Sequence, residues 1–212
     1  MNNLLLAIDT THEYGSVALL SADRLIQERL VHAPDGFGHV IFDEVARLDC
    51  RLEDVVCFAA ASGPGSFTGV RVGLACVKGL AEGMGRPVVA VSNLEALSTF
   101  GASNIRAVVM DARRGEIYGA VYDADRNLLR PETVQTLSVW LKTLPEGEVE
   151  FISPDFSRLD VALTGTTAPR AIAAAVGKIA WARVQAGETQ DPAAIDANYV
   201  RRSDAEILFG RK

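Results

Sequence analysis

The 212-residue sequence has few cysteines and no excess of positive charge, and each scarcity excludes a class of protein. Its three cysteines, Cys50, Cys57 and Cys76, lie in apolar runs and are odd in number, so buried reduced thiols are expected rather than disulfides. No CxxC pair is present, which removes the usual zinc spacing. The formal net charge of −6 argues against a chain that binds nucleic acid alone, because a phosphate backbone needs a basic stripe.

Long hydrophobic runs are also missing. Gly, Asp or Ser interrupts each apolar stretch well before the roughly 20 residues that a bilayer-spanning helix needs. The start of the chain, MNNLLLAIDT, lacks a basic segment and leads directly into a strand pattern, so no signal peptide is expected. The composition, 49% hydrophobic and 23% charged, is that of a globular protein, and we expect a cytoplasmic location without a membrane segment.

The sequence does contain an internal repeat. An ungapped alignment at a shift of 102 (111 − 9) places Asp9 on Asp111 and gives five identities over the eighteen positions 9–26. We therefore expect a duplicated strand–strand–strand–helix unit. In the first half of the chain, hydrophobic periodicity and turn residues predict strands over 4–9, 15–20, 24–31, 55–61 and 88–91, and helices after residue 40, over about 66–84 and from residue 93.

Two copies of such a unit, each with an Asp at the end of its first strand, resemble the actin–hexokinase–Hsp70 superfamily. In that fold two like domains face each other across a nucleotide cleft. The expected fold class is therefore α/β, with two such domains of duplicated topology and a reduced second one. The first is expected over 1–102, with the tail 196–212 packing back on it, and the second over 103–195. The second should contain a helix over 137–144, a strand over 148–152 and a long helix over 168–186.

The segment 62–73, SGPGSFTGVRVG, lies between a predicted strand and a predicted helix, where many enzymes bind phosphate. It lacks the lysine of a Walker A loop, and its third glycine comes one residue late for GxGxxG. It also lacks the GxSxG elbow, and no histidine can be paired with Ser66 from the sequence. His39 and Asp43 could share a helix face, but two groups are too few for a catalytic metal site. We therefore predict no catalytic residue and no metal site, and expect the loop to cap and position the next helix.

The helix over 66–84 has two unlike sides. Gly69, Gly73, Cys76 and Leu80 fall along one side, where small residues allow close approach to a sheet. The other side carries only a thin polar stripe, flanked by apolar residues. Such a helix is either deeply buried or covered by a partner, and its periodicity leaves both alternatives open.

Several motifs together resemble the TsaB (YeaZ) family: IDTTHEYGSVALL, GPGSFTGVRVGL, KGLA, PVVAVSNLEAL, DARRGEIYGAVY and NYVRR. They run from residue 4 to 124 with little interruption and recur at 198–202, whereas 137–195 matches poorly. The resemblance implies a non-catalytic activating subunit. It would act with the transferase TsaD and the ATPase TsaE to make threonylcarbamoyladenosine beside the anticodon of tRNA. It implies no cofactor for this chain alone, although the complex uses ATP, and contact with tRNA only through the complex.

The resemblance also implies that the helix after GPGSFTG docks on its counterpart in TsaD or, when TsaD is absent, in a second copy of the chain. Helical periodicity places Phe67, Arg71, Leu74, Ala75, Lys78 and Glu82 in one sector of this helix, and these are the docking residues expected. The remains of a nucleotide cleft are expected at Asp9, Thr10, Thr11 and Asp111. One alternative is an ATP-using, kinase-like enzyme. A metallopeptidase is another. The absence of the metal-binding HxxxH motif of TsaD argues against it, because Asp43 stands where the second histidine would follow His39.

Overall fold

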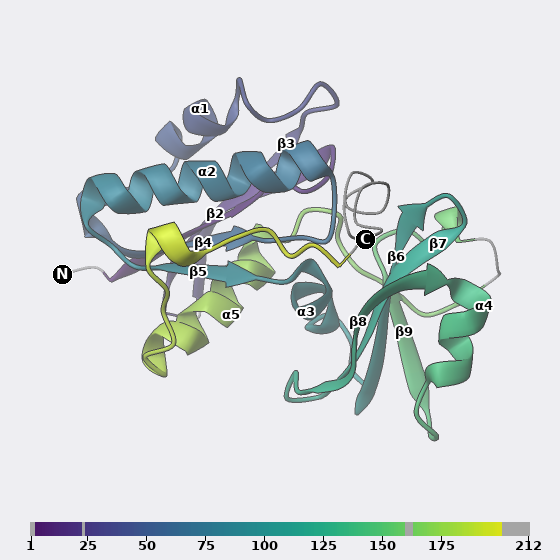
Figure 1. Ribbon diagram of the computed structural model, residues 1–212. Coiled ribbons are helices and arrows are strands. Elements are labelled where there is room, and N and C mark those ends of the chain that lie inside the picture. The colour runs from purple at the N-terminus through teal and green to yellow at the C-terminus, as the bar shows by residue number, and fades with distance from the viewer. Residues whose placement is uncertain (1–2, 23, 160–162, 201–212) are drawn as a thin grey trace, which may run out of the picture. The chain divides into compact units, whose positions relative to one another are not determined.

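The structure is a computed structural model that describes residues 3–22, 24–159 and 163–200 (Figure 1). The chain divides into two compact units, residues 1–96 with 169–197 (unit 1) and residues 97–168 with 198–212 (unit 2). Each unit is built on a five-stranded sheet. No helix in the described part of the chain is long and apolar enough to cross a membrane.

The sheet of unit 1 has its first strand in the middle. Its order is β3 (Arg24–His32), β2 (Tyr14–Ser21), β1 (Leu4–Asp9), β4 (Val55–Ala61) and β5 (Val88–Val91). The first three strands pair antiparallel, and β1, β4 and β5 pair in parallel. The central strands β1 and β4 are almost continuously apolar because both faces of the sheet are covered by helices.

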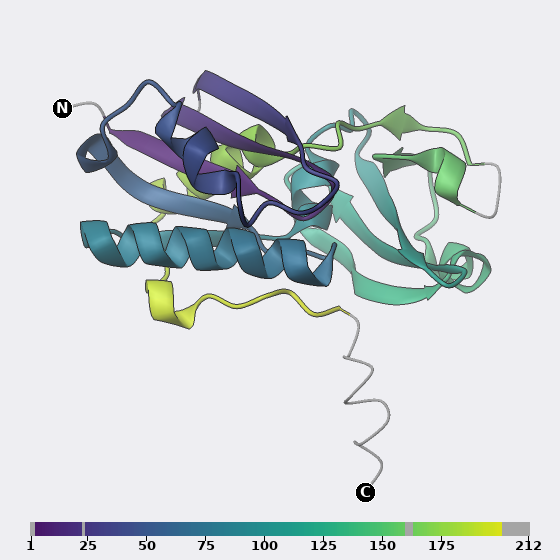
Figure 2. The ribbon, with the colours of Figure 1, turned by 90° about the horizontal axis from the view of Figure 1, so that it is seen from above.

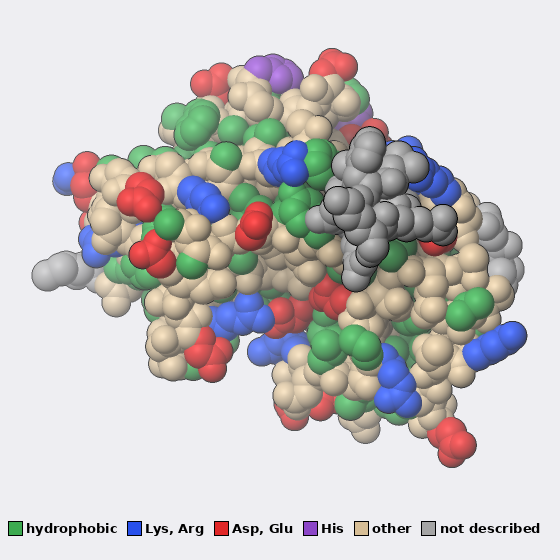
Figure 3. Space-filling model, in the orientation of Figure 1, with side chains coloured by type: hydrophobic (Ala, Val, Ile, Leu, Met, Phe, Trp, Pro, Cys, Tyr) green, Lys and Arg blue, Asp and Glu red, His purple; other side chains and the backbone are tan. Residues whose placement is uncertain are grey.

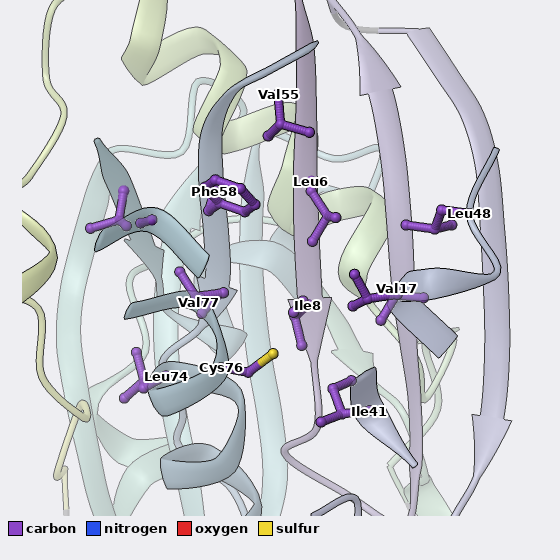
Figure 4. Packing of buried hydrophobic residues seen from close by; sticks show 14 of the residues in the cluster. Leu6, Ile8, Val17, Ile41, Leu48, Val55, Phe58, Leu74, Cys76 and Val77 are labelled. Carbon is purple, nitrogen blue, oxygen red and sulfur yellow. The ribbon is translucent and has the colours of Figure 1, made fainter. Parts of the chain in front are cut away.

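Helices cover the two faces of this sheet. On one face lie α1 (Ile41–Ala46) and α2 (Phe67–Met84), as Figures 1 and 2 show. Figure 4 shows the core between them and the sheet, where side chains of β1 and β4 meet those of α1 and α2. The other face is covered by α5 (Ala173–Gln185), which packs on β1, β2, β4 and β5. The short helix α3 (Asn93–Ser98) follows β5.

Unit 2 repeats the strand order of unit 1. Its sheet runs β10 (Thr166–Thr167), β9 (Val149–Ser153), β6 (Ile105–Arg113), β7 (Glu116–Asp123) and β8 (Leu128–Thr136), again with the first strand in the middle. Trp140, at the end of α4 (Leu137–Trp140), is buried in its core. The predicted fold class, α/β with a duplicated topology of the actin–hexokinase–Hsp70 type and a smaller second unit, is confirmed.

The structure places the domain boundary differently from the expected 1–102 and 103–195. The expected second domain included α5, but this helix packs on the sheet of unit 1, so residues 169–197 belong to unit 1. The helix also begins later than the expected residue 168. Ala168 still pairs with the end of β9, because its amide donates to the carbonyl of Ser153 at 2.9 Å. Of the tail 196–212, residues 201–212 lie outside the described part of the chain.

Candidate functional site

A buried polar network occupies the hairpin between β1 and β2, where the remains of a nucleotide cleft were expected. Asp9, Thr10 and Thr11 are all buried. One carboxylate oxygen of Asp9, Oδ1, accepts from the Thr11 amide at 3.0 Å and from Thr11 Oγ1 at 2.7 Å. The other, Oδ2, accepts from the amide of Ile172 at 3.0 Å. Both oxygens are therefore bonded by groups of the chain itself.

The same hairpin holds the glycine-rich loop in place. Asn93, at the start of α3, donates from Nδ2 to Thr11 Oγ1 at 2.6 Å and accepts at Oδ1 from the Gly63 amide at 3.1 Å. The amide of Ser66 donates to the Thr11 carbonyl at 2.7 Å. The loop is thus fastened to the β1–β2 hairpin through Ser66 and to α3 through Gly63.

The loop also starts the helix as predicted. Ser66 is the N-cap of α2, and its Oγ accepts from the Gly69 amide at 3.3 Å. Gly69 is required because a Cβ there would collide with the carbonyl oxygen of Thr10. At the other end Gly85 adopts a left-handed conformation, with φ of 60°, and closes the helix. The predicted role of the loop in capping and positioning α2 is confirmed.

The first turn of α5 is capped by side chains from three strands. Besides the Ile172 amide on Asp9, the Ala173 amide donates to Ser16 Oγ at 3.1 Å and the Ala174 amide to Glu28 Oε1 at 3.3 Å. Such caps satisfy amides that have no partner within the helix, and carboxylates at this end also favour its dipole. Sequence reasoning missed Ser16 and Glu28. No sequence signal pointed to them, because the predicted helix began at residue 168, directly after Thr167, a residue that can act as an N-cap.

The electrostatics of Asp9 follow from this enclosure. Burial raises the pKa of Asp9, and hydrogen bonds from Thr11, the charge of His12 and the hydrogen bond from Ile172 partly offset the rise. A carboxylate bonded on both oxygens by its own chain has little capacity left for a metal ion or a substrate. The corresponding Asp111 lies in unit 2, where it is half-buried and accepts from the Arg113 amide at 2.7 Å.

The exposed side of α2 carries five of the six residues expected to dock a partner. Phe67 is 51% exposed, Arg71, Ala75 and Glu82 are exposed, and Lys78 is half-buried. We call these five residues the outer face. The guanidinium of Arg71 lies over the ring of Phe67, 3.5 Å from its centroid, in a cation–π contact. Figure 3 shows single charged side chains separated by apolar and backbone surface over α2.

The expected exposure of Leu74 is wrong. This side chain is 4% exposed and belongs to the core cluster of unit 1, together with Ile195. The segment that contains Ile195 runs along α2 on the side opposite α1 (Figures 1 and 2). In Figure 4 Leu74 and Cys76 point to opposite sides of the helix, with Cys76 toward Ile8 and Ile41. Leu74 is buried because the C-terminal part of the chain returns to α2.

Metal-binding groups do not gather in the part of the chain that the structure describes. Among residues 3–22, 24–159 and 163–200, no three His, Cys, Asp or Glu side chains are placed so that they could hold one ion. The three cysteines are free thiols, and burial raises the pKa of Cys57 to about 12 and that of Cys76 to about 11. These two thiols therefore stay protonated and unreactive at neutral pH.

Comparison with known proteins agrees with this architecture. The family model for TsaD, described as tRNA N6-adenosine threonylcarbamoyltransferase, matches residues 37–181, more than half of the chain. A tRNA threonylcarbamoyladenosine biosynthesis protein TsaB from Bacillus subtilis (strain 168) is 34% identical over 164 aligned residues, and the match covers 72% of each protein. The protein of the same name from Escherichia coli (strain K12) is 35% identical over 149 residues, covering 61% of this chain and 64% of that protein.

A solved structure supports the same assignment. YeaZ from Pseudomonas aeruginosa superposes with a TM-score of 0.77 at 26% identity, over 93% of this chain and 99% of that one. The similarity therefore extends over both units rather than over the N-terminal motifs alone. The chain belongs to the family that the TsaD model describes and, within it, to the TsaB (YeaZ) proteins.

Proposed function

We propose that the chain is a non-catalytic subunit of a complex that makes threonylcarbamoyladenosine in tRNA. The names of its relatives support the process, since they are tRNA threonylcarbamoyladenosine biosynthesis proteins. The observation that carries the non-catalytic role is the network around Asp9, whose carboxylate caps the first turn of α5 and binds Thr11. An acid held in this way supports the fold and has little capacity left to activate a reactant.

In this proposal the outer face of α2 docks a TsaD-type transferase. Phe67 offers a half-exposed aromatic ring with a cation stacked on it, which is the kind of side chain that anchors an interface. Ala75 is small and exposed near the middle of the face, so a partner helix can approach closely. Lys78 and Glu82 lie beside it, one turn apart, and would select the partner by charge.

The rest of the assembly follows from the same proposal. An ATPase of the TsaE type supplies the ATP-dependent step, this chain binds no cofactor of its own, and tRNA is contacted through the complex. When the transferase is absent, a second copy of the chain uses the outer face and forms a homodimer. In this proposal the protein works in the cytoplasm, together with the tRNA that the complex modifies.

Reconstitution tests the proposed role directly. Purified chain, transferase, ATPase, threonylcarbamoyl adenylate and tRNA are combined with single components left out, and the modified nucleoside is measured by mass spectrometry. We expect modification to require both the transferase and this chain, and none from this chain alone. Modification by the isolated chain, or nucleotide turnover by it, would instead identify it as an enzyme.

Ala75→Arg tests the docking face. The bulky charge should raise the dissociation constant for the transferase about a hundredfold, or about 2.8 kcal/mol, because it occupies the place of a close helix contact. The melting temperature should hardly change, since Ala75 is exposed. Ala182→Arg, on the exposed side of α5, is the matched control and should bind as the wild type does. Unchanged affinity for Ala75→Arg would place the docking face elsewhere.

A further inference from the structure

Residues 188–197, which we call the strap, run beside α2 and attach to the free edge of the sheet of unit 1 (Figures 1 and 2). The attachment is made by one residue. Gln190 donates its amide to the Val88 carbonyl at 2.8 Å and accepts from the Val88 amide at 3.0 Å. Its side-chain Oε1 accepts from the Ala90 amide at 3.0 Å. The strap thus extends the edge of β5 by a single bridge rather than by a full strand.

The strap has one buried anchor. Ile195 is 1% exposed and shares the core cluster with Leu74, Val77 and Ala81 of α2. Every other residue of the strap is exposed or half-buried. A segment held by one buried side chain, one half-buried side chain (Ala197) and one bridge can open locally while the rest of its unit stays folded.

The strap and α1 lie on opposite sides of α2. On the α1 side, Cys76 points toward Ile41, and on the strap side Leu74 shares its cluster with Ile195 (Figure 4). When the strap is closed, α2 is held by the sheet behind it and by a neighbour along each edge. When the strap is open, Ile195 no longer packs in the cluster that contains Leu74 and Ala81, so α2 loses its support on that side.

We propose that the strap gates the docking helix, so that a transferase binds the outer face only while the strap is closed. This inference rests on the proposed function, because it concerns the same face of α2. A docking surface must be held rigidly to bind, and the strap supplies one of the supports of α2. Partner affinity then falls in proportion to the closed fraction, so any event that frees residues 188–197 weakens docking.

Ile195→Asp opens the strap by placing a carboxylate in the apolar cluster. In the free protein the strap should then be open in most molecules, so the amides of Val88 and Ala90, which donate to Gln190, should lose nearly all their protection from exchange with solvent. The amide of Ala59, in the parallel ladder of central strand β4, should keep its wild-type rate. With no more than about a tenth of the molecules closed, the dissociation constant for the transferase should rise at least about tenfold. Ala194→Asp adds the same charge at an exposed strap position and is the matched control, expected to behave as the wild type.

The outcomes separate the gate from the docking face. Lost protection of these amides with unchanged affinity overturns the gate, and the docking face stands if Ala75→Arg still weakens binding. Unchanged exchange overturns the gate as well, because Ile195 is then no anchor. If Ala75→Arg has no effect either, the proposed docking face fails. Should Ile195→Asp unfold the protein, Ile195→Ala with Gln190→Ala opens the strap more gently, and an unaltered affinity despite lost protection of the Val88 and Ala90 amides again overturns the gate.

Discussion

The sheets of the two units have the same strand order, but the hairpin that follows the first strand differs between them. In both, that strand is central, antiparallel to the second and parallel to the fourth. In unit 1 the strand ends in Asp9, which is buried and bonded on both oxygens, whereas Asp111 in unit 2 is half-buried. A sheet tolerates many apolar sequences, but a buried polar network depends on single residues, so only the sheet is common to the two copies.

The pairing register explains part of this difference. Asp9 pairs with Ser16, so a shift of 102 predicts that Asp111 pairs with Tyr118, but it pairs with Ile117. A slip of one residue exchanges the faces on which side chains lie. The partner of the Asp is therefore a polar residue that caps α5 in unit 1 and a buried apolar residue in unit 2.

The largest expected effect on stability comes from removing the buried Asp9 carboxylate, the residue in which the two hairpins differ most. Asp9→Ala leaves the amides of Thr11 and Ile172 without their acceptor inside the core, and should lower the free energy of unfolding by about 3 kcal/mol. Asp111→Ala is the matched control and should cost less than about 1 kcal/mol, since its surroundings are half-exposed. Urea unfolding measures both. Equal losses would mean that the two hairpins are equivalent in energy despite their different burial.

An intermediate effect is expected from the tertiary cap of α5. Ser16 accepts from the Ala173 amide and donates to Glu28 Oε1, so Ser16→Ala removes one cap and one support of another. The loss should be about 1–2 kcal/mol. Ser138→Ala, at an exposed helical position in unit 2, should be neutral or slightly stabilising. A loss of similar size at Ser138 would show that the cap adds nothing special to unit 1.

The smallest effect concerns a feature that the units have in common, a carboxylate that anchors a neighbouring segment. Burial alone would raise the pKa of Glu44, but the hydrogen bonds and charges of Arg29 and Arg47 outweigh it and lower that pKa. Burial alone would also raise the pKa of Glu150. Hydrogen bonds from the Thr166 side chain and from the Ser103 and Ala102 amides outweigh burial and lower that pKa.

These shifts predict how stability depends on pH. Because both folded pKa values lie below the ordinary value of 4.5, each carboxylate stabilises the fold above that pH. The stabilisation is lost as the pH falls from there through the lowered values. Glu44→Gln and Glu150→Gln should each flatten this part of the curve of unfolding free energy against pH. A variant that keeps the full wild-type slope would show that its carboxylate does not titrate in this way.

Much of the local structure could be predicted from the sequence. The strands over 4–9, 55–61 and 88–91 have the predicted bounds, because each is a run of apolar residues that ends at turn formers. The ends of α2 were also predictable, since Ser66 and Gly85 act on the backbone next to them. The repeat and the TsaB motifs lie in contiguous sequence as well, so duplication and family membership were accessible without coordinates.

Only the tertiary structure decided which segment covers which surface. The expected second domain included α5, although the helix lies on unit 1, where Asp9, Ser16 and Glu28 from three strands cap it. Leu74 was expected to be exposed, although Ile195, 121 residues further along the chain (195 − 74), shares its core cluster. Both errors have one physical cause. Periodicity reports that a helix has an apolar side, but the partner of that side is chosen by packing between segments far apart in sequence.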